Sequence, residues 1–111
     1  MKDDRVYLRH ILECIRRIEE DTAGGKDVFF ASRTSQDAVL RNLQTLAEST
    51  QRLSEELKMR HPQVEWRRIA AFRNILVHDY LGIDMERIWE IAQRDVPTLK
   101  TTVLSMLEGS E

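Results

Sequence analysis

Apolar residues recur at helical spacing along most of the chain, and this feature constrains the fold more than any other. Leu8, Ile11, Ile15 and Ile18 fall at the i, i+3, i+7 and i+10 positions of a single helical face. No segment alternates apolar and polar residues with the two-residue period of a half-buried strand between hairpin turns. The pattern therefore predicts an all-α fold without a sheet.

Breaker and capping residues divide this pattern into about five helices. Gly24 and Gly25 end the first helix, Pro62 follows the second, and Asp84 can cap the fourth. The expected helices run over about 3–21, 35–59, 66–79 and 84–94, with a fifth from about Pro97 onward. Long helices joined by short connections predict an up-down helical bundle.

The length and composition fit a single domain over residues 1–111. A chain of this size has a modest core, near the small end of what is stable alone, so dimerisation would not be surprising. Its one cysteine, Cys14, excludes an internal disulfide and a cysteine metal cluster. The formal net charge of -2 gives no global basic field that would attract nucleic acid. A nucleic-acid site in this chain would therefore depend on a local group of basic residues and not on the overall charge.

The chain shows no membrane signal. No apolar run approaches the ~20 residues that a membrane-spanning helix needs. The first residues, Met-Lys-Asp-Asp-Arg, lack the apolar stretch of a signal peptide. We therefore expect a cytoplasmic protein that does not associate with a membrane.

The third predicted helix carries a candidate reactive strip. At about 100° per residue, Arg73, Val77, Asn74 and His78 follow in angular order over about 140°. A ligand could lie across this strip and contact both Arg73 and His78, or two copies of the helix could meet there. Arg41, on the second predicted helix, is a further candidate for the same cleft. The plainer alternative is a surface arginine with a histidine satisfied at a helix end.

The residue types on this strip suit the cleavage of a phosphodiester in RNA. Histidine exchanges protons near neutral pH, and arginine offers a permanent charge and forked donors to a developing phosphorane. The attacking group would be the ribose 2′-hydroxyl, which DNA lacks, so the expected substrate is RNA and not DNA. We expect no metal and no cofactor, because the other histidines, His10 and His61, lie in separate segments.

The motif Arg73-x4-His78-x-Tyr80 resembles the signature of the HEPN superfamily, and specifically of its HepT-like toxins. The flanking segments are similar to the family as well, so that the resemblance covers nearly the whole chain. These segments are Asp37-Ala-Val-Leu-Arg41-Asn-Leu-Gln, His61-Pro-Gln-Val-Glu-Trp66-Arg-Arg-Ile-Ala, Gly82-Ile-Asp-Met-Glu-Arg-Ile-Trp89 and Asp95-Val-Pro97-Thr-Leu.

The resemblance implies a fold, an activity and a partner. Members of this family are all-α homodimers that place two Arg-x4-His motifs in one cleft. Arg73 and His78 would then be the catalytic residues of a metal-independent endoribonuclease, and Asn74 a supporting residue. Tyr80 would be the tyrosine that a nucleotidyltransferase antitoxin (MntA-like) modifies with AMP to silence the toxin. This describes a type VII-like toxin–antitoxin pair.

A second function stays open at this stage. The helical dimer could instead be a non-catalytic subunit that binds a nucleotidyltransferase, or a nucleotide, through the same cleft. RNA cleavage by the pure protein without metal would separate the two hypotheses. The sequence identifies neither the RNA target nor the stoichiometry with an antitoxin.

Overall fold

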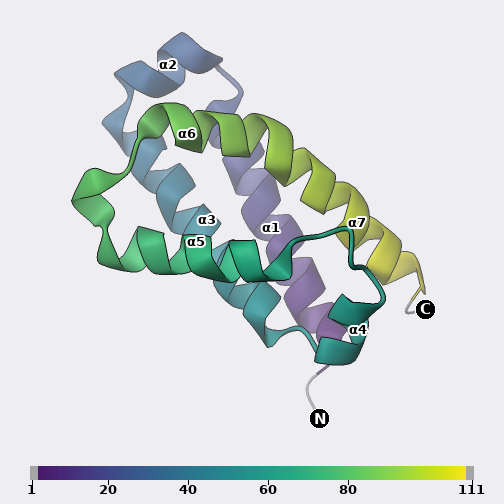
Figure 1. Ribbon diagram of the computed structural model, residues 1–111. Coiled ribbons are helices and arrows are strands. Elements are labelled where there is room, and N and C mark those ends of the chain that lie inside the picture. The colour runs from purple at the N-terminus through teal and green to yellow at the C-terminus, as the bar shows by residue number, and fades with distance from the viewer. Residues whose placement is uncertain (1–2, 110–111) are drawn as a thin grey trace.

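The computed structural model describes residues 3–109, except for the side chain of Tyr80, and is shown in Figure 1. Among these residues there are helices and turns but no strand, which confirms the predicted all-α fold. The elements are α1 (Asp4–Thr22), α2 (Lys26–Ala31), α3 (Arg33–Arg52), α4 (Glu55–Met59), α5 (Trp66–His78), a 3-10 turn η1 (Tyr80–Gly82), α6 (Met85–Glu90), a π-helical turn η2 (Ile91–Asp95) and α7 (Val96–Gly109).

The core lies between α1, α3 and α7. Helices α1 and α3 run side by side in opposite directions (Figure 1), and their apolar sides pack against each other. Ile11, Ile15 and Val39 are fully buried there, and Val103 of α7 covers them. Each such side chain contributes roughly 1.5–3 kcal/mol when it leaves water. The helical periodicity therefore identified the residues that hold the bundle together.

Cys14 also belongs to this core. It is buried, and this burial raises the pKa of its thiol. A thiol held in its neutral form behaves as a small apolar side chain and is chemically inert.

The predicted loop after the first helix contains the short helix α2. Gly25, its N-cap residue, has φ of +95°, a conformation that glycine adopts without steric cost. The turn at Gly25 brings Phe29 into the core, where it is fully buried against Trp89. Phe30, which borders Phe29 edge-on, stays 37% exposed.

The predicted helix over 35–59 is divided into α3 and α4. Leu53 adopts an extended backbone, and the hydroxyl of Ser54 accepts a hydrogen bond from the N–H of Leu57, capping α4. The carboxylate of Asp4, at the start of α1, accepts hydrogen bonds from the N–H and the hydroxyl of Ser54 at 2.8 and 2.7 Å. The break is therefore fixed by a contact between segments 50 residues apart.

The last two predicted helices form one continuous helix from Met85 to Gly109. Asp84 caps its start as predicted, with its carboxylate accepting from the N–H of Glu86. Pro97 is the second residue of α7, close to the predicted start of the fifth helix. No loop precedes it. Instead the turn before it widens to a π-helix, in which the N–H of Val96 donates to the carbonyl of Ile91, and the chain accommodates a residue without an N–H. No helix within residues 3–109 is long and apolar enough to span a membrane.

Candidate active site

Helix α5, which carries the motif, packs across α3 and lies in front of it in Figure 1. The indole N–H of Trp66 fixes its start by donating to the carbonyls of Lys58 and His61, both at 3.1 Å. Leu76 is the one fully buried side chain of this helix. The helix is therefore held at its start and near its end, and most of its surface remains accessible.

The apolar face of α5 is only partly buried. Ile69 and Phe72 border a groove of about 530 Å³ that separates α5 from α6, η2 and α7. Ile75, one turn after Ala71 on the same side, is 50% exposed. The apolar side chains on this side of α5 therefore line a groove instead of the closed core.

Arg73 is held by α3. Its Nε and Nη2 atoms both donate to one carboxylate oxygen of Glu48, at 3.2 and 3.0 Å, and its Nη1 donates to the side-chain oxygen of Asn74 at 3.3 Å. The amide of Gln44, one turn before Glu48, donates to the same carboxylate oxygen at 3.4 Å. Arg73 and Asn74 thus contact each other, and Glu48 fixes the guanidinium.

His78 occupies the other flank of α5. It is the last residue of the helix and is exposed to solvent, whereas the Arg73 side chain is 30% exposed and faces α3. The backbone N–H of Asp79 closes the helix by donating to the carbonyl of Ile75 at 2.9 Å. Within one chain, therefore, Arg73 and His78 flank the strip predicted from the helical geometry without converging on one point.

The turn after the motif helix is apolar and accessible. Leu81, in η1, is 97% exposed, and Val77 of α5 is 37% exposed. Tyr80 begins the same turn, but its side chain lies outside the part that the structure describes. The predicted modification residue is thus placed by its backbone, directly after the motif helix.

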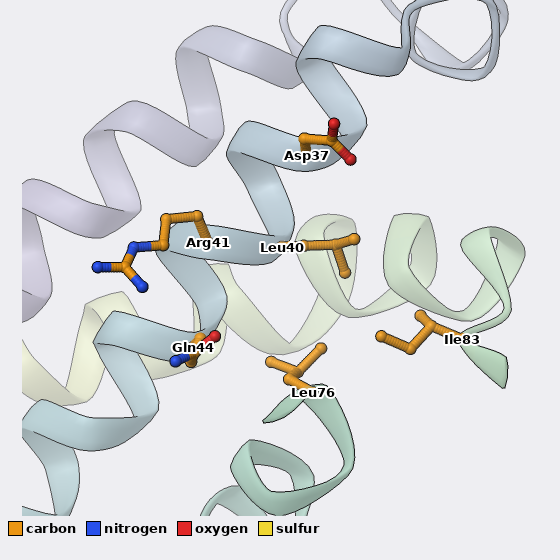
Figure 2. Close-up of a pocket in the computed structure, with 6 residues that line it drawn as sticks. All are labelled: Asp37, Leu40, Arg41, Gln44, Leu76 and Ile83. Atoms are coloured by element: carbon orange, nitrogen blue, oxygen red, sulfur yellow. The ribbon is translucent and has the colours of Figure 1, made fainter. Parts of the chain in front are cut away.

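A cavity of about 130 Å³ opens beside the motif, between α3, the end of α5 and the segment before α6 (Figure 2). Leu76, three residues after Arg73, forms part of its wall. Arg41, the further candidate from α3, lies at its edge and is exposed. The lining residues are Asp37, Leu40, Arg41, Gln44, Leu76 and Ile83.

Glu48 and Gln44 belong to this site but were not predicted from the sequence. Both are polar residues on the exposed flank of an amphipathic helix, and 25 residues separate Glu48 from Arg73. The only available signal was their four-residue spacing, which places them on one side of α3. Among the described residues, no group of three or more His, Cys, Asp or Glu side chains is arranged to hold a metal ion.

The sequence of this chain is similar to proteins of a known family. A family model described as "Ribonuclease HepT-like" matches residues 11–106. A Methanocaldococcus jannaschii protein named "Gamma-glutamylcyclotransferase and putative RNase" is 38% identical over 108 residues. That match covers 96% of this chain and 49% of the relative, so the chain spans about half of that protein's length.

Two further relatives match over most of their own length. A "Probable ribonuclease HepT" of Thermococcus cleftensis is 34% identical over 98 residues, covering 85% of this chain and 86% of the relative. A "Putative RNase" of Caldanaerobacter subterraneus subsp. tengcongensis is 33% identical over 109 residues, covering 97% of each. No solved structure gives a significant match.

Proposed function

Because this chain belongs to the HepT-like ribonuclease family, we propose that it is the ribonuclease toxin of a type VII-like toxin–antitoxin pair and cleaves RNA without a metal ion. The observation that carries the proposal is the arrangement on α5. One flank presents a guanidinium fixed by Glu48 and Asn74, and the other presents the exposed imidazole of His78. A fixed cation and a mobile proton carrier are what metal-free phosphodiester cleavage requires.

In the proposed reaction, His78 removes the proton of the ribose 2′-hydroxyl. The 2′-oxygen then bonds to the adjacent phosphorus, and the bond from phosphorus to the 5′-oxygen breaks. The imidazolium of His78 formed in this way then donates its proton to the leaving 5′-oxygen, which regenerates the neutral histidine. The products are a 2′,3′-cyclic phosphate and a 5′-hydroxyl. Arg73 stabilises the charge that gathers on the non-bridging oxygens, and Asn74 keeps its guanidinium oriented.

The proposed active unit is a homodimer. Arg73 and His78 lie about 140° apart around α5, so one chain presents them to different sides. Two α5 helices that meet along this strip would place the Arg73 of one chain opposite the His78 of the other. The apolar side chains of Val77 and Leu81, which are exposed in the single chain, would be covered in such a dimer.

We propose that a nucleotidyltransferase antitoxin silences this site by transferring AMP from ATP to the hydroxyl of Tyr80. Such a modification adds a phosphodiester charge and an adenosine directly after the motif helix. The added charge would compete for Arg73, and the adenosine would obstruct RNA. Intact-mass analysis of the chain expressed with and without a neighbouring nucleotidyltransferase tests this step, with Tyr80→Phe as the variant that should gain no adenylate mass.

The cleavage proposal is tested with Arg73→Ala and His78→Ala. Each is expected to lower the rate of RNA cleavage in EDTA by about 10²–10⁴-fold, the usual contribution of a positioned proton-transfer group or charge. Both residues are at least partly exposed, so circular dichroism and the thermal midpoint should stay at the wild-type values. Pure wild-type protein that binds RNA or nucleotide but never cleaves would favour the non-catalytic partner subunit instead.

A further inference from the structure

The cavity beside the motif has an apolar interior and a polar edge. In Figure 2 the side-chain ends of Leu40, Leu76 and Ile83 turn toward a common space, and they come from α3, α5 and the segment before α6. Arg41 and Gln44 stand on the α3 side of that space. An apolar surface with a few polar groups at its edge is how proteins bind small planar ligands.

The size of the cavity restricts what it can hold. Its volume of about 130 Å³ corresponds to roughly four waters, and it is smaller than the roughly 300–1,000 Å³ of sites that enclose a whole cofactor or drug-sized ligand. A single heterocyclic ring system fits this volume, whereas a complete nucleotide does not. The sugar and phosphate of a bound nucleotide would therefore remain outside the cavity.

The cavity is contiguous with the residues that hold Arg73. The amide nitrogen of Gln44 donates to the Glu48 oxygen that accepts from Arg73, at 3.4 Å. On the opposite wall, Leu76 follows Arg73 by one helical turn. A base inserted between these two walls would carry its ribose and phosphate toward the guanidinium.

The polar edge favours guanine. The forked guanidinium of arginine is the most common reader of the O6 and N7 acceptors of guanine. Arg41 is exposed, and in Figure 2 its guanidinium points away from the cavity. The side chain must therefore rotate to reach over a bound base, and its exposure leaves it free to do so. The amide of Gln44 donates to Glu48 through its nitrogen and leaves its oxygen to accept from the amino group of guanine. Asp37 already interacts within the chain and is not needed for this recognition.

We propose that this cavity binds the base of the RNA nucleotide next to the scissile phosphate and selects guanine through Arg41. The proposal rests on the proposed ribonuclease function, because it assigns a substrate preference to the same site. A purine could also reach the cavity from an adenylate attached to the protein. Binding and cleavage must therefore be measured separately.

Binding is measured by methyl NMR of Leu40, Leu76 and Ile83 during titration with guanosine 5′-monophosphate. We expect these methyl signals to shift with the guanine nucleotide, and cytidine 5′-monophosphate at the same concentration to shift them less. Arg41→Met should weaken binding of the guanine nucleotide by at least about fivefold, the lower end of what one forked base contact provides. Arg33→Met, the same change about 12 Å away along α3, is the matched control and should bind as the wild type does.

Cleavage is measured by mapping the cut sites in an RNA of mixed sequence. Wild-type protein should cut next to guanine between about 5- and 150-fold more often than next to cytosine or uracil, and Arg41→Met should abolish this preference.

RNA cleavage without base preference, together with unshifted methyl signals, would overturn the proposal and leave the ribonuclease function standing. Methyl shifts with the guanine nucleotide in a protein that cuts no RNA would overturn the function but not the base site. Stronger shifts with adenosine 5′-monophosphate and no guanine preference in the cuts would assign the cavity to an adenylate and overturn the RNA assignment.

Discussion

Arg73 is not a free cation, because two of its guanidinium nitrogens donate to one carboxylate oxygen of Glu48. This pair holds the guanidinium in one orientation and limits the positions from which a phosphate can approach it. The Arg73 and Glu48 side chains are 30% and 38% exposed, so the pair contributes only about 0–1 kcal/mol to folding. Glu48 therefore matters to orientation more than to stability.

From this contact we predict that Glu48→Ala lowers kcat for RNA cleavage by roughly tenfold or more, because misplacing a positioned charge is costly. KM should change little, since removing an acidic residue does not weaken the attraction to RNA. Glu48→Gln keeps one side-chain oxygen as an acceptor and should restore part of kcat. Steady-state kinetics on a short RNA provide the measurement.

Glu19→Ala is the matched control for this prediction, because Glu19 pairs with Lys100 at 3.0 Å in a similarly exposed ion pair between two other helices. It should leave both kinetic constants unchanged. If Glu48→Ala instead lowered the thermal midpoint by many degrees while kcat per folded molecule stayed constant, Glu48 would be structural and would have no positioning role.

At the level of single residues, the sequence allowed the motif to be predicted but not its supporting contacts. Arg73, Asn74 and His78 share one helix, so the order in which they flank it follows from 3.6 residues per turn. Glu48 lies on a different helix, and its relation to Arg73 depends on how α5 crosses α3. The angle at which the two helices cross cannot be predicted from a local pattern of apolar residues.

At the level of elements, the junction of α1, α3 and α4 depends on one carboxylate. Asp4 accepts hydrogen bonds from both the N–H and the hydroxyl of Ser54, and the same hydroxyl caps α4. We predict that Asp4→Ala lowers the free energy of unfolding by about 1–2 kcal/mol, the range for hydrogen bonds to a charged group at a partly exposed site. Urea denaturation followed by circular dichroism measures the change.

The control for that prediction is Asp21→Ala, near the other end of the same helix. An acidic residue there faces the negative end of the helix dipole, so its removal should be neutral or slightly stabilising. RNA cleavage should be unaffected by Asp4→Ala at temperatures where the protein is folded. Equal unfolding free energies for the two variants would show that the Asp4–Ser54 contact contributes nothing.

The same junction shows why helix boundaries were harder to predict than helix faces. Leu53 and Leu57 continue the apolar stripe of α3 and are both buried, so periodicity alone reads the segment as one helix. The break at Ser54 arises because Asp4 binds its backbone N–H from outside the segment. At Pro97 the predicted start was correct to one residue, but a π-helical turn joins α7 to α6 where the sequence suggested a break.

At the level of the whole molecule, the exposed apolar turn after the motif helix predicts self-association. Leu81 is 97% exposed, so replacing it costs no packing within the chain. We predict that Leu81→Asp weakens the dimer by about tenfold or more, because the proposed contact would then bury an unpaired carboxylate. Sedimentation equilibrium measures this, with Leu104→Asp on α7, also an exposed leucine, as a control that should dimerise normally. A dimer unaffected by Leu81→Asp would place the interface elsewhere.

The dimer also makes a prediction about which chain supplies which group. Arg73→Ala and His78→Ala are each expected to be inactive as pure dimers. If the cleft combines the Arg73 of one chain with the His78 of the other, mixed dimers of the two variants keep one complete pair, and cleavage should return when the variants are unfolded and refolded together. The recovered rate is limited by the share of mixed dimers.

Two controls test this interpretation. The double variant with both Arg73→Ala and His78→Ala, refolded with either single variant, should recover no cleavage. Adding Leu81→Asp to both single variants should also abolish recovery, because it weakens the dimer. Mixed dimers that form, as shown by native mass spectrometry, but stay inactive would mean that the two groups act within one chain or that both copies of each are required, and the shared pairing proposed here would be wrong.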